Sequence, residues 1–100
     1  MQEPDMTVAL FQISQDLITE KKVTIYPNPT QGMFQVDIAG YEITRDAKIY
    51  MYNASGAMIM QTNGVSESNV MDISSQPPGM YLMKISNGMK QIGSWKIIKE

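Results

Sequence analysis

Residues 23–38, VTIYPNPTQGMFQVDI, contain two strand-like runs joined by a short segment rich in proline. Proline cannot donate a backbone hydrogen bond to a sheet, so Pro27 ends the first run or confines it to an edge. Each residue before a proline is held in extended geometry, and Pro29 then presets φ for a turn. Gly32 releases the chain into the second run. The stretch therefore predicts two strands joined by a stiff corner.

The second run alternates apolar and polar residues with a period of two, which is typical of a half-buried strand. Phe34, Val36 and Ile38 share one of its faces. Further strand-like runs follow, separated by turn residues, at 47–52, 57–62, 69–73, 80–86 and 91–99. With 23–26 and 33–38, this makes seven short strands. Turn signals spaced about 8 to 12 residues apart predict an all-β fold, an antiparallel sandwich of two facing sheets.

Turn residues also predict how neighbouring strands are joined. NASG at 53–56 is expected to close a hairpin between 47–52 and 57–62. NG at 87 and 88 is expected to form a second hairpin turn, because Asn and Gly both tolerate positive φ. Gly93 suggests a bulge in the last strand, and the carboxylate of Asp72 is expected to cap the turn that follows it.

Residues 1–22 differ from the rest and are interpreted as an N-terminal extension of a sandwich that spans 23–100. The segment is expected to form a short helix or strand lying on the sandwich. A helix is suggested by apolar residues at helical spacing, namely Leu10, Ile13, Leu17 and Ile18, whereas TVALFQI (7–13) also suits an edge strand.

Composition argues against several functions. The net charge is −2, and the eight basic residues form no dense stripe, so nucleic-acid binding is not expected. The chain has neither histidine nor cysteine, which removes Ser-His-Asp and Cys-His chemistry and most zinc sites. Its acidic residues do not follow a calcium-loop spacing. We therefore expect no catalytic residue, metal or cofactor. No apolar run is long enough to span a bilayer.

Aromatic and methionine residues admit two interpretations each. Tyr50 and Tyr52 share a strand face and would suit a sugar-stacking surface, although packing is favoured because tyrosine fits a pleated sheet well. The ten methionines would suit an adaptable binding surface, although core filling is favoured. The methionines at strand positions are Met51, Met58, Met60, Met71 and Met83.

Four ordered motifs resemble the C-terminal sorting domains of the type IX secretion system of Bacteroidetes. YPNPTQG (26–32) is similar to the opening motif of that family, and YNASGAMI (52–59) to its hairpin. MDISSQPPGMYLMKI (71–85) is similar to its Asp-apolar-Ser and Pro-x-Gly-x-Tyr signature, and KIIKE (96–100) to its ending. The matching motif residues are Tyr26, Pro27, Asn28, Pro29, Gly32, Gly56, Asp72, Pro78, Gly79 and Tyr81.

Two departures from the family pattern are Gln76, where an apolar residue is usual, and Glu100 at the end of the chain. The resemblance implies an immunoglobulin-like sandwich of about seven strands. It also implies a non-catalytic address, carried through the periplasm, read by an outer-membrane translocon and commonly removed by a sortase-like peptidase. Its attached cargo would then reach the cell surface or the medium.

Recognition by the translocon is expected near PPGMY and the terminal KIIKE. A charged pair that flanks two isoleucines would leave an exposed end for a receptor to grip. The residues expected to make this contact are Lys96, Ile97, Ile98 and Lys99.

A sorting tag needs cargo, yet only the short segment 1–22 precedes the matching region. The chain would therefore be a piece of a larger secreted protein, a complete small one, or a former tag that became a binding module. The alternative function is accordingly a free-standing immunoglobulin-like binding or adhesion module at the cell surface, which would meet a partner at a strand edge or through loops. An enzyme is a distant third. The oligomeric state is left open.

Overall fold

A computed structural model of the protein describes residues 20–100 and shows seven strands there, in the runs that the sequence predicts. Each strand bound lies within one residue of the predicted one. The predicted helix or strand at the N-terminus falls largely on residues 1–19, which lie outside the described residues. The strands are β1 Lys22–Tyr26, β2 Met33–Ala39, β3 Lys48–Tyr52, β4 Met58–Thr62, β5 Ser68–Asp72, β6 Gly79–Asn87 and β7 Lys90–Lys99.

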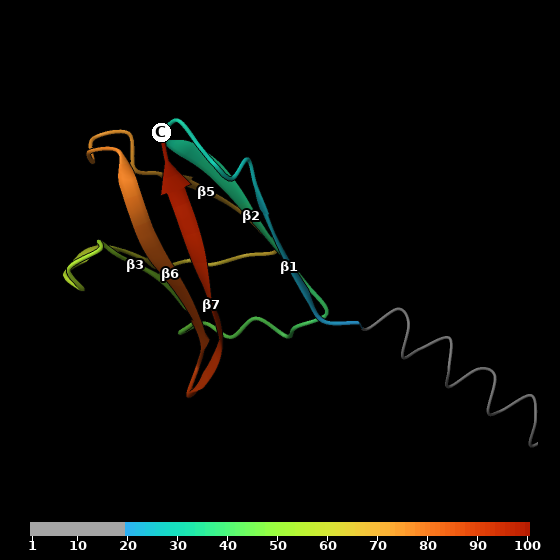
Figure 1. Cartoon of the computed structure of the whole chain (residues 1–100). Helices are drawn as coiled ribbons and strands as arrows, with labels where there is room; N and C mark the ends of the chain where they lie inside the picture. Colours follow the sequence, from blue (N-terminus) through green and yellow to red (C-terminus); the bar gives the residue numbers. More distant parts are fainter. Residues whose placement is uncertain (1–19) are drawn as a thin grey trace, which may run out of the picture.

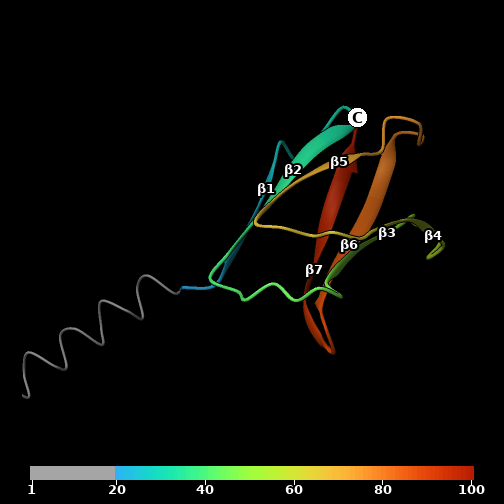
Figure 2. The same ribbon diagram turned by 180° about the vertical axis from the view of Figure 1, so that it is seen from behind.

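The strands build two layers, which face one another in Figures 1 and 2. One sheet has the order β1-β2-β5 and the other the order β4-β3-β6-β7, with antiparallel pairing throughout. This is the order of an immunoglobulin-like sandwich, except that the fourth strand pairs with β3 instead of the fifth strand, its neighbour in constant-type domains. The predicted antiparallel sandwich is confirmed.

The core lies between the sheets and is built from the inward-facing residue of each alternating pair. Met51, Met71 and Met83 are fully buried, so their predicted role as core residues is confirmed, whereas Met58 is 52% exposed. Met58 differs because β4 is an edge strand whose pairing with β3 is irregular beside Tyr52. The core cluster consists of Phe34, Val36, Ile38, Ile49, Met51, Met71, Ile73, Tyr81, Met83, Ile85 and Ile97.

The β3–β4 hairpin closes through the predicted NASG turn. Gly56 takes the left-handed conformation there, with φ of +92°, and its backbone N–H donates to the carbonyl of Asn53 over 2.9 Å. The side-chain oxygen of Asn53 accepts hydrogen bonds from the backbone N–H groups of Ser55 and Ala57, at 3.1 and 2.9 Å. Asn53 therefore acts in this turn as an acceptor.

The β6–β7 turn lies one residue later than predicted. Asn87 pairs with Lys90, so the two loop residues are Gly88 and Met89. The carboxamide of Asn87 binds the loop after β2 instead: Oδ1 accepts from the Thr44 backbone N–H over 2.8 Å, and Nδ2 donates to a neighbouring carbonyl over 2.8 Å. These long-range bonds hold Asn87 in the strand. The predicted bulge is present beside Gly93, where the residue before it has no partner on β6.

Candidate recognition site at the C-terminal strand

The proline corner packs against the last strand of the chain. Asn28 Nδ2 donates to the carbonyl of Lys96 over 2.8 Å, and Asn28 Oδ1 accepts from the backbone N–H of Ile98 over 3.0 Å. The carboxamide thereby offers β7 one donor and one acceptor, as a peptide group of a neighbouring strand would. Asn28 therefore attaches the corner to the edge of β7, about 70 residues away in sequence.

Thr30 continues this attachment with its own backbone. Its N–H donates to the carbonyl of Ile98 over 2.8 Å, and its carbonyl accepts from the N–H of Glu100 over 2.9 Å. Thr30 is buried, and its hydroxyl donates to the carbonyl of Met33 over 2.6 Å. The resulting parallel bridge joins the corner between β1 and β2 to β7, an edge strand of the other sheet, and Figure 1 shows the C-terminus beside the corner.

Gly32 and the turn after β5 touch so closely that no side chain fits between them. A Cβ atom on Gly32 would lie 2.4 Å from Ser74 Oγ and 2.9 Å from Ser74 Cα, and φ of Gly32 is +149°. The carbonyl of Gly32 also accepts from the N–H of Ile73 over 2.8 Å. Asp72 Oδ1 accepts from the Ser74 N–H over 2.9 Å, which confirms the predicted cap. Hydrogen bonds from Ser74 lower the pKa of Asp72.

The same end of the sandwich holds the PPGMY segment and the side chain of Lys99. Lys99 Nζ donates to the carbonyl of Gln76 over 2.7 Å, and the hydroxyl of Tyr81 donates to the carbonyl of Pro77. The second contact resembles the tyrosine corner of immunoglobulin domains, where a tyrosine near the start of the sixth strand binds the backbone just upstream. Gln76, a departure from the family pattern, thus contributes its backbone carbonyl to the contact with Lys99.

The expected recognition residues have different environments. Ile97 is fully buried in the core, so the expectation of an exposed end is wrong for this side chain. The reason is strand alternation, which turns Ile97 inward beside Tyr81 and leaves Lys96 outward. Lys99 is half-buried and hydrogen-bonded, and the backbone of Ile98 is bound by the corner. Lys96 has the most exposed side chain of the four.

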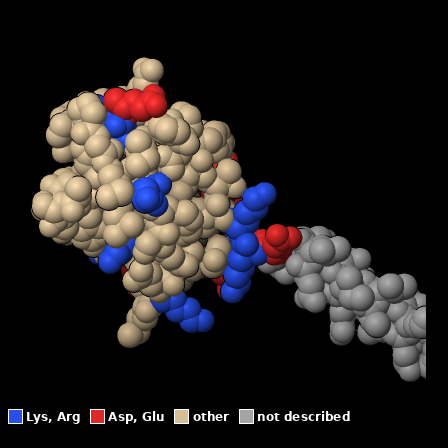
Figure 3. All heavy atoms as spheres, in the orientation of Figure 1, with Lys and Arg blue, Asp and Glu red and all other residues tan. Residues whose placement is uncertain are grey.

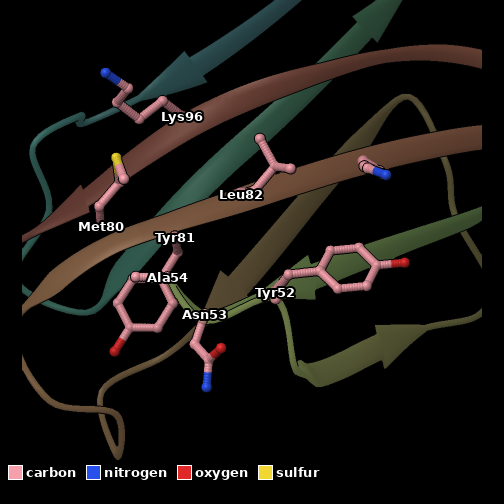
Figure 4. A pocket seen from close by; sticks show the side chains of 9 residues that line it. Tyr52, Asn53, Ala54, Met80, Tyr81, Leu82 and Lys96 are labelled. Atoms are coloured by element: carbon pink, nitrogen blue, oxygen red, sulfur yellow. The ribbon is translucent and has the colours of Figure 1, made fainter.

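A groove on the outer face of the four-stranded sheet begins at Lys96 (Figure 4). It has a volume of about 480 Å³ and crosses β7, β6 and β3. Its charged lining residues are Lys84 and Lys96, and Lys84 Nζ lies 5.3 Å from the centroid of the Tyr52 ring. The sequence did not reveal this groove, because it needs the side-by-side order of three strands. It is lined by Tyr52, Asn53, Ala54, Gly56, Met80, Tyr81, Leu82, Lys84 and Lys96.

Tyr26, the first residue of the opening motif, lies on the outer face of the other sheet. Its hydroxyl donates to Asp37 Oδ2 over 2.7 Å, and Gln35 Nε2 donates to Asp37 Oδ1 over 3.0 Å. These two hydrogen bonds lower the pKa of Asp37, and the bond to Asp37 raises the pKa of Tyr26. These hydrogen bonds hold Tyr26 to the neighbouring strand β2, and the Tyr26 side chain remains 44% exposed.

Residues 20–100 contain no group of three or more acidic side chains, histidines or cysteines that could hold a metal ion. Over the described part of the chain, no helix is long and apolar enough to cross a membrane. Figure 3 shows a largely uncharged face, on which basic side chains are scattered and gather mainly where the described chain begins.

The fold is an immunoglobulin-like β-sandwich in which the corner at 26–32, the turn at 72–79 and the end of β7 meet at one end. A family model described as a secretion system C-terminal sorting domain matches residues 24–100. The chain therefore belongs to the family of type IX secretion C-terminal sorting domains. Membership implies export to the cell surface or the extracellular space. No curated protein matches the chain.

Proposed function

We propose that the domain is a non-catalytic sorting signal that the outer-membrane translocon of the type IX system reads in its folded form. The observation that supports this proposal is the meeting of three motifs at one end of the sandwich. The corner at 26–32, the turn at 72–79 and the end of β7 are joined there by backbone and side-chain hydrogen bonds. A receptor docking at this end would contact all three motifs at once.

Lys96 is the residue we propose for direct contact with the translocon. Its side chain is exposed beside the hydrogen-bonded corner, and Met80 and Leu82 next to it are 47% and 38% exposed. A cation beside an apolar surface suits a receptor that carries carboxylates around an apolar patch. Ile97, Ile98 and Lys99 act in this proposal by holding β7 in place.

A sortase-like peptidase is proposed to act after export, in keeping with the family. The chain before β1 is exposed at Glu20 and Lys21, so a peptidase would reach the backbone there without unfolding the sandwich. Immunoblotting of whole cells and medium with an antibody to 23–100 would measure the native size. A cellular band well above 11.2 kDa would support an attached cargo, and a single band near 11.2 kDa would favour a free-standing module instead.

A point substitution tests recognition better than truncation does. Deleting 96–100 would remove Ile97 from the core, so loss of export would then reflect unfolding as well as recognition. A reporter fused to the full chain in a secretion-competent strain should lose surface display with Lys96→Ala and keep it with Lys90→Ala, an exposed lysine at the opposite end of β7. Equal display of both variants would contradict the proposed role of Lys96.

A further inference from the structure

The groove beside Lys96 combines apolar and cationic surface. Met80 and Leu82 are exposed large apolar residues, and Lys84 and Lys96 supply positive charge without any carboxylate among the lining residues. A simple anion would leave the apolar surface in water, and a purely apolar ligand would leave both lysines unpaired. The groove therefore fits a peptide that carries both acidic and apolar side chains.

The N-terminal segment 1–19 of this chain has that composition. It includes Glu3, Asp5 and Asp16 and no lysine or arginine, so its side chains carry a formal charge of −3. The described outer face that it would meet is cationic at the groove. Large apolar residues accompany the acidic ones, namely Val8, Leu10, Phe11, Ile13, Leu17 and Ile18.

The segment is attached close enough to reach the groove. Lys21 lines a hollow together with Gln91 and Ile92, so the described chain begins beside the start of β7. Lys96 lies five residues beyond Gln91 on that strand, a distance of about 17 Å at about 3.3 Å per residue. Nineteen residues span about 63 Å fully extended and about 28 Å even if wholly helical. Tethering also raises the local concentration to about the millimolar range.

We infer that residues 1–19 bind in this groove, with their carboxylates near Lys84 and Lys96 and their apolar side chains over Met80 and Leu82. The binding itself is independent of the proposed function, but its consequence rests on that function. A bound segment would cover Lys96 and so compete with the translocon for the same surface. The N-terminal segment would thereby regulate when the sorting signal is accessible.

Paramagnetic relaxation in the full chain tests this binding. The chain has no cysteine, so Gln12→Cys creates a unique site for a nitroxide spin label. The amide signals of Leu82 and Lys96, at the groove, should broaden strongly in NMR spectra. The amide of Val70, on an exposed edge strand of the other sheet, should be unaffected. Undetectable broadening at the groove, or equal broadening at Val70, would overturn the inference.

Charge substitutions test the recognition chemistry. The double substitution of Lys84→Gln with Lys96→Gln should reduce the broadening by about threefold or more. Each exposed ion pair contributes modestly to docking, and this variant removes both pairs together. Lys90→Gln is the control for either single substitution, Lys84→Gln or Lys96→Gln, because it removes the same one charge outside the groove, and it should change little. Raising the salt concentration should weaken docking in the unsubstituted chain too. Broadening unaffected by both salt and the lysine substitutions would refute the ionic contribution.

Dilution identifies the occupant. Intramolecular docking predicts broadening that is independent of protein concentration, whereas broadening lost on dilution would mean that the segment binds a second molecule and would overturn the inference. The measurement contains no secretion machinery, so its failure would leave the proposed export function untouched. Conversely, normal display of a Lys96→Ala reporter would count against the export role while leaving the NMR result unchanged.

Discussion

Replacing Asn28 by aspartate tests the attachment between the corner and the last strand with the smallest change of shape. Asn28 uses both halves of its carboxamide: Nδ2 donates to the carbonyl of Lys96 over 2.8 Å, and Oδ1 accepts from the N–H of Ile98 over 3.0 Å. Asn28→Asp keeps the acceptor and removes the donor. A carboxylate oxygen would then face the carbonyl oxygen of Lys96 at hydrogen-bond distance, where the two repel.

The expected loss follows from the hydrogen bond that disappears. One such bond contributes about 0.5–1.5 kcal/mol net, and an acceptor left without its donor costs about 1–3 kcal/mol where water is excluded. Asn28 is exposed, so water relieves part of this cost. We therefore expect Asn28→Asp to lower the free energy of unfolding by about 1–2 kcal/mol at pH 7.

The loss should depend on pH with a defined sign. A protonated carboxyl group can again donate to the carbonyl of Lys96, so the folded variant favours the protonated form and the pKa of the introduced group lies above its unfolded value of about 3.9. Relative to the parent protein, the variant should therefore recover stability as the pH falls through the folded pKa. Comparison with the parent at each pH removes the contribution of the other carboxylates.

Urea unfolding followed by tryptophan fluorescence at pH 7 and near pH 3.5 measures both effects. Asn53→Asp is the matched control, because Asn53 Oδ1 accepts hydrogen bonds in its turn and a carboxylate retains that role. The control should lose less stability at pH 7 than Asn28→Asp does. Equal losses for the two variants, or a loss at Asn28 that does not change with pH, would refute the argument.

Three further predictions concern the same end of the molecule. Gly32→Ala should cost about 2–4 kcal/mol in urea unfolding, because its Cβ would clash with Ser74, whereas Gly56→Ala, with open space around it, should lose only about 1–2 kcal/mol from backbone strain. Ile97→Ala should cost about 2–5 kcal/mol by the same assay, because the side chain is fully buried. Acid should lower the urea midpoint, because the pKa values of Asp37, Asp46 and Asp72 are lowered in the folded protein. These carboxylates stabilise the fold at pH values above their unfolded pKa near 4, and that stabilisation is lost as the pH falls through their folded pKa.

The strands and the core face were predictable because their signals are local. Alternation with period two assigns Phe34, Val36 and Ile38 to one face whatever their partners are, and the structure buries all three. Turn chemistry was equally informative at 53–56, where the expected hairpin turn forms with Gly56 in the left-handed conformation. The β6–β7 turn moved by one residue because the Asn87 side chain bonds to a distant loop, and no local preference encodes that contact.

The candidate site was only partly predictable, since its contacts join distant parts of the sequence. The motifs identified the participating segments, but they did not indicate that Asn28 pairs with the backbone around Ile98. The end at 96–99 was expected to be exposed because two lysines flank its two isoleucines, whereas alternation along β7 places Ile97 in the core. The groove at Lys84 and Lys96 depends on sheet order, and a single sequence does not specify which strands become neighbours.

The attachment of the corner to β7 links folding to recognition. Strand β7 is paired with β6 on one side, and near its end its other edge is bound by Asn28 and Thr30. Under the proposed function, a receptor that binds Lys96 therefore finds it in a fixed position only when the corner at 26–32 has packed against β7. Lys96→Ala should then abolish display at unchanged stability, whereas Asn28→Asp should reduce stability first and display only as far as the folded fraction falls. Loss of display by Asn28→Asp in a fully folded population would instead mean that the receptor contacts the corner itself.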